Sequence, residues 1–384
     1  MADNKSQHFV PRFYLKRFTE REKAINLYNW KAEKGIFNAS LKEQCCRAYY
    51  YGADLKMEHE FADVEGMVDN YFKLVDQFGV LPKQGSDDHD ALLFWIVLQD
   101  CRTPYAADTI DEMTEQMVKA TLADHREVTQ EMLDSVRITH GDPVHAAIYY
   151  KAPSYPLLRD MHIKLVVSPP GTEFITSDTP VVSHNQLMEF RRRFGSTVGI
   201  GWKGLQMFYP ISARLMIMLY DPNVYVVGDR KSHWLFLTDK RDVDELNVLQ
   251  AAHSYKNFYF NSSRSNFLQV AQRAKPFKRT AKAKTHIGQK EIEPDGKGFS
   301  RLIGFTTQEV QMDLNLTFVR MTKPAKAYQA EARAQKKMIP SVVMRSAEVQ
   351  RLTHEYTEER RRVRKAQLKE RDAAEAAAKP REGA

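Results

Sequence analysis

The sequence predicts an α+β protein: a helical N-terminal half packed on a mostly antiparallel sheet, with a basic, partly helical C-terminal extension. Three observations support this class. Apolar residues recur at helical spacing before Pro156, and short β-rich segments follow that proline. Basic residues then concentrate near the end. From Val270 onward 26 Lys and Arg stand against 14 Asp and Glu, whereas residues 1–269 carry 31 against 35.

The composition excludes several classes of protein. The 384 residues are 43% hydrophobic and 11% aromatic, which suffices for a sizeable core. No apolar run approaches the roughly 20 residues of a membrane helix, and the polar start lacks a signal core. We therefore expect no membrane association. The three cysteines, Cys45, Cys46 and Cys101, are no disulfide framework and indicate a reducing compartment, so we expect a cytoplasmic location.

The helical half begins after one short predicted strand over residues 24–30. Residues 60–77 place six apolar side chains on one face of a helix. Residues 91–102 contain the run LLFWIVL, which is apolar all round and predicts a helix buried at the centre of the domain. Residues 107–135 predict a more polar helix, and residues 144–150 a short one.

The sheet half consists of short segments rich in β-branched and aromatic residues, which favour strands. A helix is predicted over residues 242–255, among strands over residues 161–168, 173–176, 208–211, 214–219, 224–227, 234–237 and 257–260. Residues 306–320 then alternate between apolar and polar, which predicts a strand with one buried face. Residues 342–375 predict a long, charged helix.

Composition divides the chain into four parts. We expect a body over residues 1–269, a basic linker over 270–300, an added strand region over 301–340, and a charged helix with a tail over 341–384. Residues 272–290 carry seven basic residues and no acidic one. Such a block is either a nucleic-acid-binding arm or a solvated loop. As an arm, it would contact nucleic acid through Lys275, Lys278, Arg279, Lys282 and Lys284.

Two motifs lie early in the chain. Residues 7–18 are so rich in aromatics that they must be packed, which holds the polar side chains among them, including His8, at fixed places. These side chains either pin the segment by hydrogen bonds or serve a site. Gln99 and Arg102 end the most apolar helix. We expect Arg102 to be at least partly buried with an acidic or carbonyl partner; alternatively, its guanidinium clamps a carboxylate or phosphate.

A third motif, residues 176–180, follows a predicted strand and reads TSDTP. Its Asp178 is either a turn former that accepts backbone N–H bonds or a site carboxylate at a strand end. The sequence contains no G-x-x-x-x-G-K-[ST] phosphate loop, C-x-x-C pair, H-E-x-x-H or G-x-S-x-G motif. The sequence leaves the cofactor undetermined. A divalent metal ion is compatible with it, but no clear set of ligands is present.

In this order the motifs resemble the bacterial domain-of-unknown-function family 4238, over about residues 7–262. The resemblance rests on QHFVPRFYLKRF at residues 7–18, QDCRTP at 99–104, FITSDTPV at 174–181, PIS at 210–212 and Asn247 in the late helix. The family has no settled activity. Some members lie near mobile-element and phage-defence genes, so the resemblance implies a role in defence. The basic residues after about residue 271 lie outside the shared pattern.

Two functions of different classes fit these observations. In the first, His8, Arg102 and Asp178 converge on one pocket as a group titrating near neutrality, an anion clamp and a carboxylate, and hydrolyse a phosphodiester. Substrate-binding side chains would then be Arg12, Tyr14, Gln99, Ser177 and Asn247. In the second, the same residues are structural pins, and the protein only binds nucleic acid or a protein partner. The two differ in whether the three catalytic candidates reach a common cavity.

Overall fold

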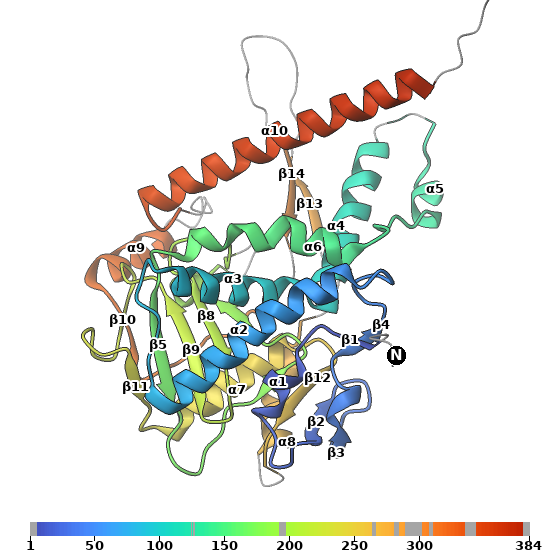
Figure 1. The fold of residues 1–384 in the computed structure, drawn as a ribbon. Coiled ribbons are helices and arrows are strands. Elements are labelled where there is room, and N and C mark those ends of the chain that lie inside the picture. The colour runs from blue at the N-terminus through green and yellow to red at the C-terminus, as the bar shows by residue number, and fades with distance from the viewer. Residues whose placement is uncertain are drawn as a thin grey trace, which may run out of the picture.

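The computed structural model describes residues 6–123, 125, 127–191, 197–262, 266–279, 284–288, 302–306, 310–334 and 343–378; at 284–288, 302–306, 364, 368 and 371–378 only the backbone is described. These residues form ten α-helices and several mostly antiparallel sheets, which confirms the α+β class (Figure 1). The helices are α1 (Arg12–Lys16), α2 (Lys56–Phe78), α3 (Asp87–Cys101), α4 (Pro104–Leu122), α5 (Gln130–Ser135), α6 (Pro143–Lys151), α7 (Lys240–His253), α8 (Phe267–Ala274), α9 (Lys323–Ala334) and α10 (Ala347–Ala378).

The strands form two larger sheets and three pairs. The larger sheets have the strand orders β11-β5-β9-β8-β7 and β3-β2-β12-β6, and the pairs are β1-β4, β10-β15 and β13-β14. Every described pairing is antiparallel except β11 with β5. The strands are β1 (Ser6–His8), β2 (Ala24–Asn29), β3 (Lys34–Ser40), β4 (Cys46–Ala48), β5 (His162–Val167), β6 (Thr176–Ser177), β7 (Val182–His184), β8 (Gln206–Pro210), β9 (Leu215–Tyr220), β10 (Tyr225–Val227), β11 (Trp234–Phe236), β12 (Asn257–Phe260), β13 (Lys284–Gly288), β14 (Leu302–Thr306) and β15 (Val319–Met321).

The five-stranded sheet separates two hydrophobic cores, because β9 is buried on both faces. Ile217 and Leu219 belong to the first core, whereas Met216, Met218 and Tyr220 belong to the second. Alternate residues of a strand point to opposite faces of its sheet. A strand buried on both faces therefore has a continuous apolar sequence, here LMIMLY. The sheet is the wall that both cores share.

The first core is built from the N-terminal segment and the helices α2 and α3, which lie over one face of the sheet (Figure 1). Trp95 of α3 is fully buried, as the apolar run LLFWIVL predicts. The helix begins after Ser86, whose hydroxyl accepts the backbone N–H of His89 at 3.3 Å and caps it. Phe9 and Phe18 bring the start of the chain into the same core.

The second core combines α7 and α8 with a segment from the C-terminal extension. Residues 310–318 alternate between buried and exposed side chains up to residue 317, as predicted from their sequence. The buried side chains of this alternation belong to Val310, Met312, Leu314 and Leu316. The predicted strand does not form: within the described part of this segment, strand pairing begins only with β15.

Side chains of the body replace the missing strand partner. The Glu189 carboxylate accepts the backbone N–H of Leu314 at 2.7 Å, and the Gln186 amide donates to the Leu314 carbonyl at 2.6 Å. Asp242 accepts the backbone N–H of Thr317 at 2.8 Å. Buried backbone groups need partners, and these three side chains supply them without a sheet ladder.

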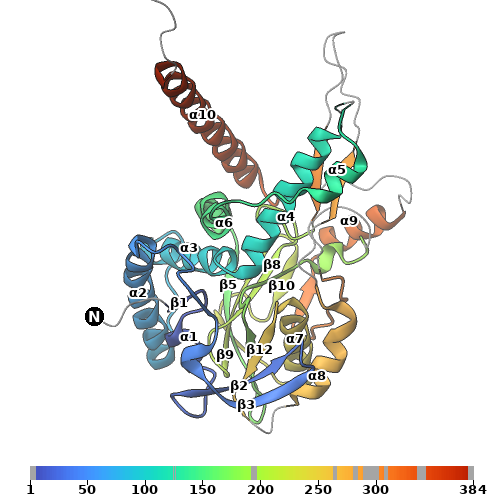
Figure 2. The same cartoon turned by 90° about the vertical axis from the view of Figure 1, so that its right-hand side faces the viewer.

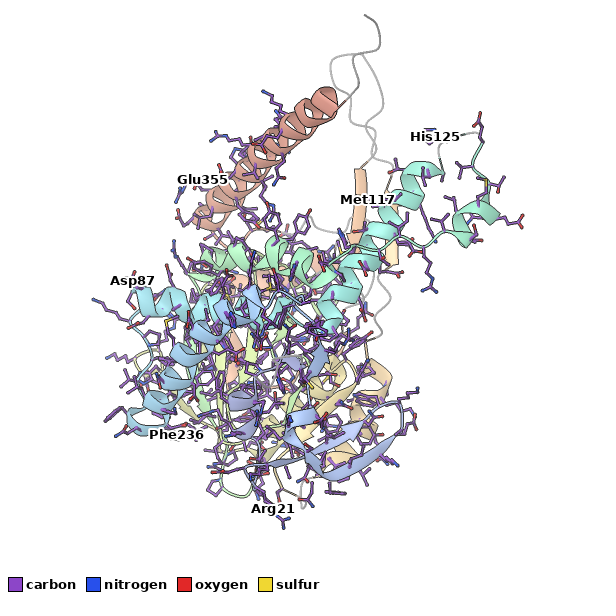
Figure 3. All side chains as sticks on the ribbon, turned by 45° about the vertical axis from the view of Figure 1, so that its right-hand side comes forward. Arg21, Asp87, Met117, His125, Phe236 and Glu355 are labelled. Atoms are coloured by element: carbon purple, nitrogen blue, oxygen red, sulfur yellow. The ribbon has the colours of Figure 1, made fainter. Side chains whose placement is uncertain are left out.

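The predicted helix over residues 107–135 is interrupted. The chain leaves α4 at Leu122 and resumes helical structure in α5, and Figure 3 shows Met117 and His125 on this arm, which stands away from the body. Several elements were not predicted, among them β3, α8 and α9. The strand β3 is mostly exposed, so it carries little of the apolar alternation that marks a half-buried strand.

The last part of the chain returns to the body before it leaves again. The side chain of Arg345 is buried and forms an ion pair with Asp160 at 2.8 Å. The helix α10 then packs on the 3-10 turn Ala152–Leu158 and on α6, where the Tyr356 hydroxyl donates to the Tyr150 carbonyl at 2.9 Å. Its far end stands clear of the body (Figure 2).

Candidate functional site

His8 lies in β1, opposite Cys46 of β4. Its Nε2 is 3.1 Å from the Lys42 carbonyl, so this nitrogen donates and the ring is held against the backbone. Burial lowers the pKa of His8 below its ordinary value; the bond to Lys42 opposes this shift, and the charges of Arg12 and Arg102 add to it. The imidazole is therefore predominantly neutral at pH 7.

Arg102 follows the last turn of α3 and is fully buried, as predicted. Its Nη1 donates to Glu65 Oε1 at 2.9 Å, which supplies the expected acidic partner. The guanidinium carbon lies 5.3 Å from the centre of the Phe61 ring and 5.1 Å from that of Trp95. Among the described residues, Nε and Nη2 have no hydrogen-bond partner. Aromatic faces attract a cation without satisfying its N–H groups.

Asp178 is buried directly after β6, and its side chain reaches the turn between α7 and β12. Its carboxylate accepts the backbone N–H groups of Tyr255, Lys256 and Asn257 at 2.7, 2.6 and 3.0 Å. Burial raises the pKa of Asp178, and these three bonds oppose the shift. As the first interpretation expects, the Asp178 carboxylate accepts backbone N–H groups, but the turn that it holds is formed by residues 255–257 and not by its own Thr-Pro segment.

Three of the five predicted binding residues hold the backbone of another segment, and Ser177 holds the backbone of its own turn. The Tyr14 hydroxyl donates to the Pro210 carbonyl at 2.6 Å, and the Gln99 amide donates to the Phe9 carbonyl at 2.9 Å. The Ser177 hydroxyl donates to the Thr179 carbonyl at 2.9 Å. The Asn247 amide donates to the Glu173 carbonyl at 2.8 Å and accepts the backbone N–H of Ile175 at 3.0 Å. Arg12 is exposed at the start of α1.

The three predicted catalytic residues are not brought together. The charge of Arg102 acts on the pKa of His8, so these two residues are neighbours. Asp178 shares no hydrogen bond or ion pair with either within the described contacts. None of the three lines either of the two cavities that are described below.

The basic tract is partly folded onto the body. Lys275 pairs with Glu33 at 2.8 Å on the surface. The Lys278 ammonium donates to backbone carbonyls at the end of α7, and burial lowers the pKa of Lys278 to about 8. Arg279 lines a cavity. Lys282 and the side chain of Lys284 lie outside the described residues.

The larger cavity, of about 570 Å³, lies among α4, α6 and the first turns of α10. We call it the interhelix cavity. Its apolar wall includes Ile110, Met113 and Val198, and the residues that close it from the C-terminal extension are Val310, Thr353, Tyr356 and Thr357. The cavity therefore lies where the body and the extension meet.

A few polar groups converge on the interhelix cavity. The Arg279 guanidinium carbon lies 3.6 Å from the centre of the Tyr105 ring, and its buried Nε has no partner among the described residues. Lys151 is neutralised by an ion pair with Asp100. His253 Nδ1 donates to a carbonyl of α7, and burial holds the pKa of His253 well below its ordinary value. Its neutral ring therefore keeps Nε2 as an acceptor.

Sequence reasoning reached only part of this cavity. Arg279 was predicted as a surface contact rather than a wall. Asp100 and Cys101 lie inside the motif at residues 99–104, but the residues predicted as functional there were Gln99 and Arg102, which share one helix face. The other polar lining groups come from separate elements, and no local pattern marks them.

Neither a metal centre nor a membrane helix is found in the part of the chain that the structure describes. No three His, Cys, Asp or Glu side chains there are arranged to hold a metal ion. Within the same residues, each helix is too short or too polar to cross a bilayer.

Comparisons with known proteins give one match. The family described as "Protein of unknown function (DUF4238)" matches the chain over residues 6–264, which covers the N-terminal segment, both larger sheets and α7. No curated protein and no solved structure matches. The match includes most of the walls of the interhelix cavity but ends before Arg279, Val310 and α10.

Proposed function

Because the chain belongs to the DUF4238 family, for which no activity is established, its function has to be inferred from its own cavities, and we propose that it binds single-stranded nucleic acid without cleaving it. One nucleotide would occupy the interhelix cavity. The single observation that carries this proposal is the Arg279 guanidinium stacked on Tyr105 in the wall of a 570 Å³ cavity. Cavities of about 300–1,000 Å³ suit nucleotide-sized ligands.

The cavity offers the three contacts that a nucleotide uses. Tyr105 and Tyr150 provide aromatic surface, and stacking of a base on such a ring contributes about 1–3 kcal/mol. Arg279 provides a guanidinium for the phosphate, a group it suits by charge and by its planar fork of donors. His253 Nε2 provides an acceptor for the N–H groups of a base.

The surroundings of the cavity favour a polyanion. Arg360 of α10 lies 4.5 Å from the centre of the Tyr150 ring, and the exposed Arg361 follows it. The last third of the chain is strongly basic, whereas the body is slightly acidic. Such asymmetry attracts nucleic acid to one side of a protein.

We do not propose hydrolysis, because the predicted catalytic residues are occupied by the protein itself. Asp178 accepts three backbone N–H groups, His8 is bonded to the Lys42 carbonyl, and Arg102 is paired with Glu65. These contacts match the structural pins of the second hypothesis. We also propose a cytoplasmic location, since all three cysteines are free thiols. A role in phage defence stays a prediction.

Fluorescence anisotropy with a labelled single strand of about ten nucleotides tests the proposal. The full-length protein should bind this strand more tightly than the matching duplex, because only an unpaired base can enter the cavity. Arg279→Gln should weaken binding about tenfold. Tyr105→Leu should also weaken it, since the stacking surface is lost.

Lys275→Gln is the matched control, because Lys275 belongs to the same basic tract but lies on the surface, paired with Glu33. It should change affinity much less than Arg279→Gln. An equal loss in both variants would indicate general surface charge and contradict seating in the cavity. Absence of binding to any single strand at about 50 mM salt would contradict the whole proposal.

A further inference from the structure

We propose that a second cavity, which shares no lining residue with the interhelix cavity, binds a dianionic phosphate, either free or at the end of a monoester. This cationic pocket, of about 260 Å³, lies where β5 meets the loop between α2 and α3 and the loop between β10 and β11. The described residues that line it include no Asp or Glu. Its basic side chains are His89, His162, His233, Lys164, Arg230 and Lys231.

Lys164 is the buried cation of the pocket, with 3% of its surface exposed. Its ammonium donates to the carbonyls of Asp229 and Ser232, which fixes its position. An ammonium has three N–H donors, so one remains for a ligand in the pocket. Burial lowers the pKa of Lys164, and the nearby Asp229 charge opposes this shift. An anion in the pocket would favour the charged ammonium in the same way.

His89 is a second buried donor. It is 1% exposed, and its Nδ1 accepts the backbone N–H of Gly85 at 3.4 Å. In a neutral imidazole that accepts at Nδ1, the proton is on Nε2. His89 therefore keeps one N–H for the pocket without needing a positive charge. This donor comes from the first turn of α3, on the side of the pocket formed by the α2–α3 loop.

Two cations and an imidazole complete the pocket at its rim. Arg230 and Lys231 are exposed and belong to the loop between β10 and β11, opposite the α2–α3 loop. His162 lies at the start of β5. Burial lowers the pKa of His162 most, and the nearby charges of Lys164 and Arg230 lower it further. Like charges crowd together here, and an anion would relieve their repulsion.

A hydrogen bond fixes the β10–β11 loop against the end of α2, beside the pocket. His233 Nε2 donates to the Gly79 carbonyl at 2.8 Å and so ties the β10–β11 loop to the end of α2. Gly79 has a φ of +62°, and a Cβ there would lie 1.8 Å from the Trp234 ring. No other residue fits so close a contact, which makes the pocket part of the fold rather than a loose gap.

The arrangement favours phosphate over a carboxylate. Donors approach from three segments, and a tetrahedral anion with several oxygens can bond to all of them at once. A carboxylate has two oxygens in one plane and leaves donors unused. A nucleic-acid strand is also unsuited, since its phosphates are diesters with a chain on both sides, whereas a monoester presents a free dianionic end.

Isothermal titration of the full-length protein with inorganic phosphate tests this proposal. We expect binding with one site per chain that is at least about tenfold tighter than binding of acetate at equal ionic strength. A phosphomonoester, glycerol phosphate, should compete with phosphate if the site takes an ester; if it does not compete, the site takes free phosphate. Both outcomes support a phosphate site, and equal affinity for acetate would overturn it.

The double variant Arg230→Gln, Lys231→Gln should weaken phosphate binding about tenfold or more, and because both residues are exposed the fold should be kept. Lys240→Gln is the matched control, an exposed lysine outside the pocket. Arg279→Gln should bind phosphate as the parent does, which separates this site from the interhelix cavity. Loss in Arg279→Gln with no loss in the double variant would overturn the assignment to the cationic pocket.

Discussion

One N-terminal segment and one segment of the C-terminal extension complete the two cores. Their backbone N–H and C=O groups find hydrogen-bond partners in different ways. Residues 6–18 enter the first core in regular structure, with β1 paired to β4 and α1 behind it. Residues 310–318 enter the second core as an extended chain held by Gln186, Glu189 and Asp242. A buried backbone thus requires hydrogen-bond partners, but a neighbouring β-strand is only one structure that can supply them.

The two segments differ in the groups that form hydrogen bonds with their backbone. Much of the N-terminal segment bonds to its own turn in α1 and to one strand, so its fit depends on its own sequence. The C-terminal segment depends on body side chains that must already be in place. We therefore expect losses in the N-terminal segment to affect the whole fold, and losses in the C-terminal segment to affect the second core.

Removal of residues 1–18 should have the largest effect. The deletion takes Phe9 and Phe18 out of the first core, and each buried Phe is worth about 3–5 kcal/mol against Ala. A typical domain is stable by only ~5–15 kcal/mol. Circular dichroism should show no cooperative melting for this variant, whereas removal of residues 1–5 should be tolerated. A cooperative transition without residues 1–18 would contradict this ranking.

Arg102→Ala should come next, with a loss of about 3–5 kcal/mol in the free energy of unfolding. The substitution removes the partner of Glu65 and empties space between Phe61 and Trp95. Urea unfolding measures the change. Arg12→Ala, at an exposed arginine in the neighbouring α1, should leave stability nearly unchanged. Equal stability of both variants would mean that Arg102 does not support the first core.

Leu314→Ala tests the second core and should cost about 2–5 kcal/mol, because a buried side chain is lost from the packing of that core. Its neighbour Asn315 is exposed, so Asn315→Ala is the control and should be close to neutral. If the two variants melt alike, residues 310–318 lie on the second core without contributing to its stability.

Lys278→Met should change how the stability of the protein depends on pH. Burial lowers the pKa of Lys278 from 10.5 to about 8 in the folded protein. Between these values the unfolded chain binds a proton that the folded protein does not, so this residue makes the free energy of unfolding rise with pH. That rise should be smaller in Lys278→Met, as measured by urea unfolding between pH 8 and 10.

Lys240→Met serves as the control for this measurement, because Lys240 is exposed at the start of α7. Its curve should follow that of the parent protein over the same range of pH. Identical slopes for Lys278→Met and the parent would show that the Lys278 ammonium is not desolvated against the end of α7.

The sequence predicted the elements that a local pattern of apolar residues marks. The run LLFWIVL predicted the buried helix α3, and the alternation from Val310 to Leu316 predicted which side chains are buried. It did not predict how the backbone of that segment is satisfied, because Glu189 and Asp242 lie more than seventy residues away. Long-range pairing of this kind leaves no local pattern.

The candidate site was harder to predict for the same reason. Polar motifs such as those around His8 and Asp178 stand out in a sequence because folded backbone needs them at fixed places, and here they hold turns and strands. The interhelix cavity is lined by Tyr105, His253 and Arg279 from three separate elements. Only the fold brings these residues together, and each is unremarkable within its own segment.

The position of residues 310–318 in the second core has a consequence for how the protein is made. The first core is built from residues 9–259, and all of them leave the ribosome before Val310 is synthesised. At ordinary rates of translation the second face of the sheet then waits roughly 3–13 s for the segment that covers it, up to Ala325. During that interval the second core lacks Val310, Met312, Leu314 and Leu316, so the apolar side chains that they cover are exposed on the nascent chain.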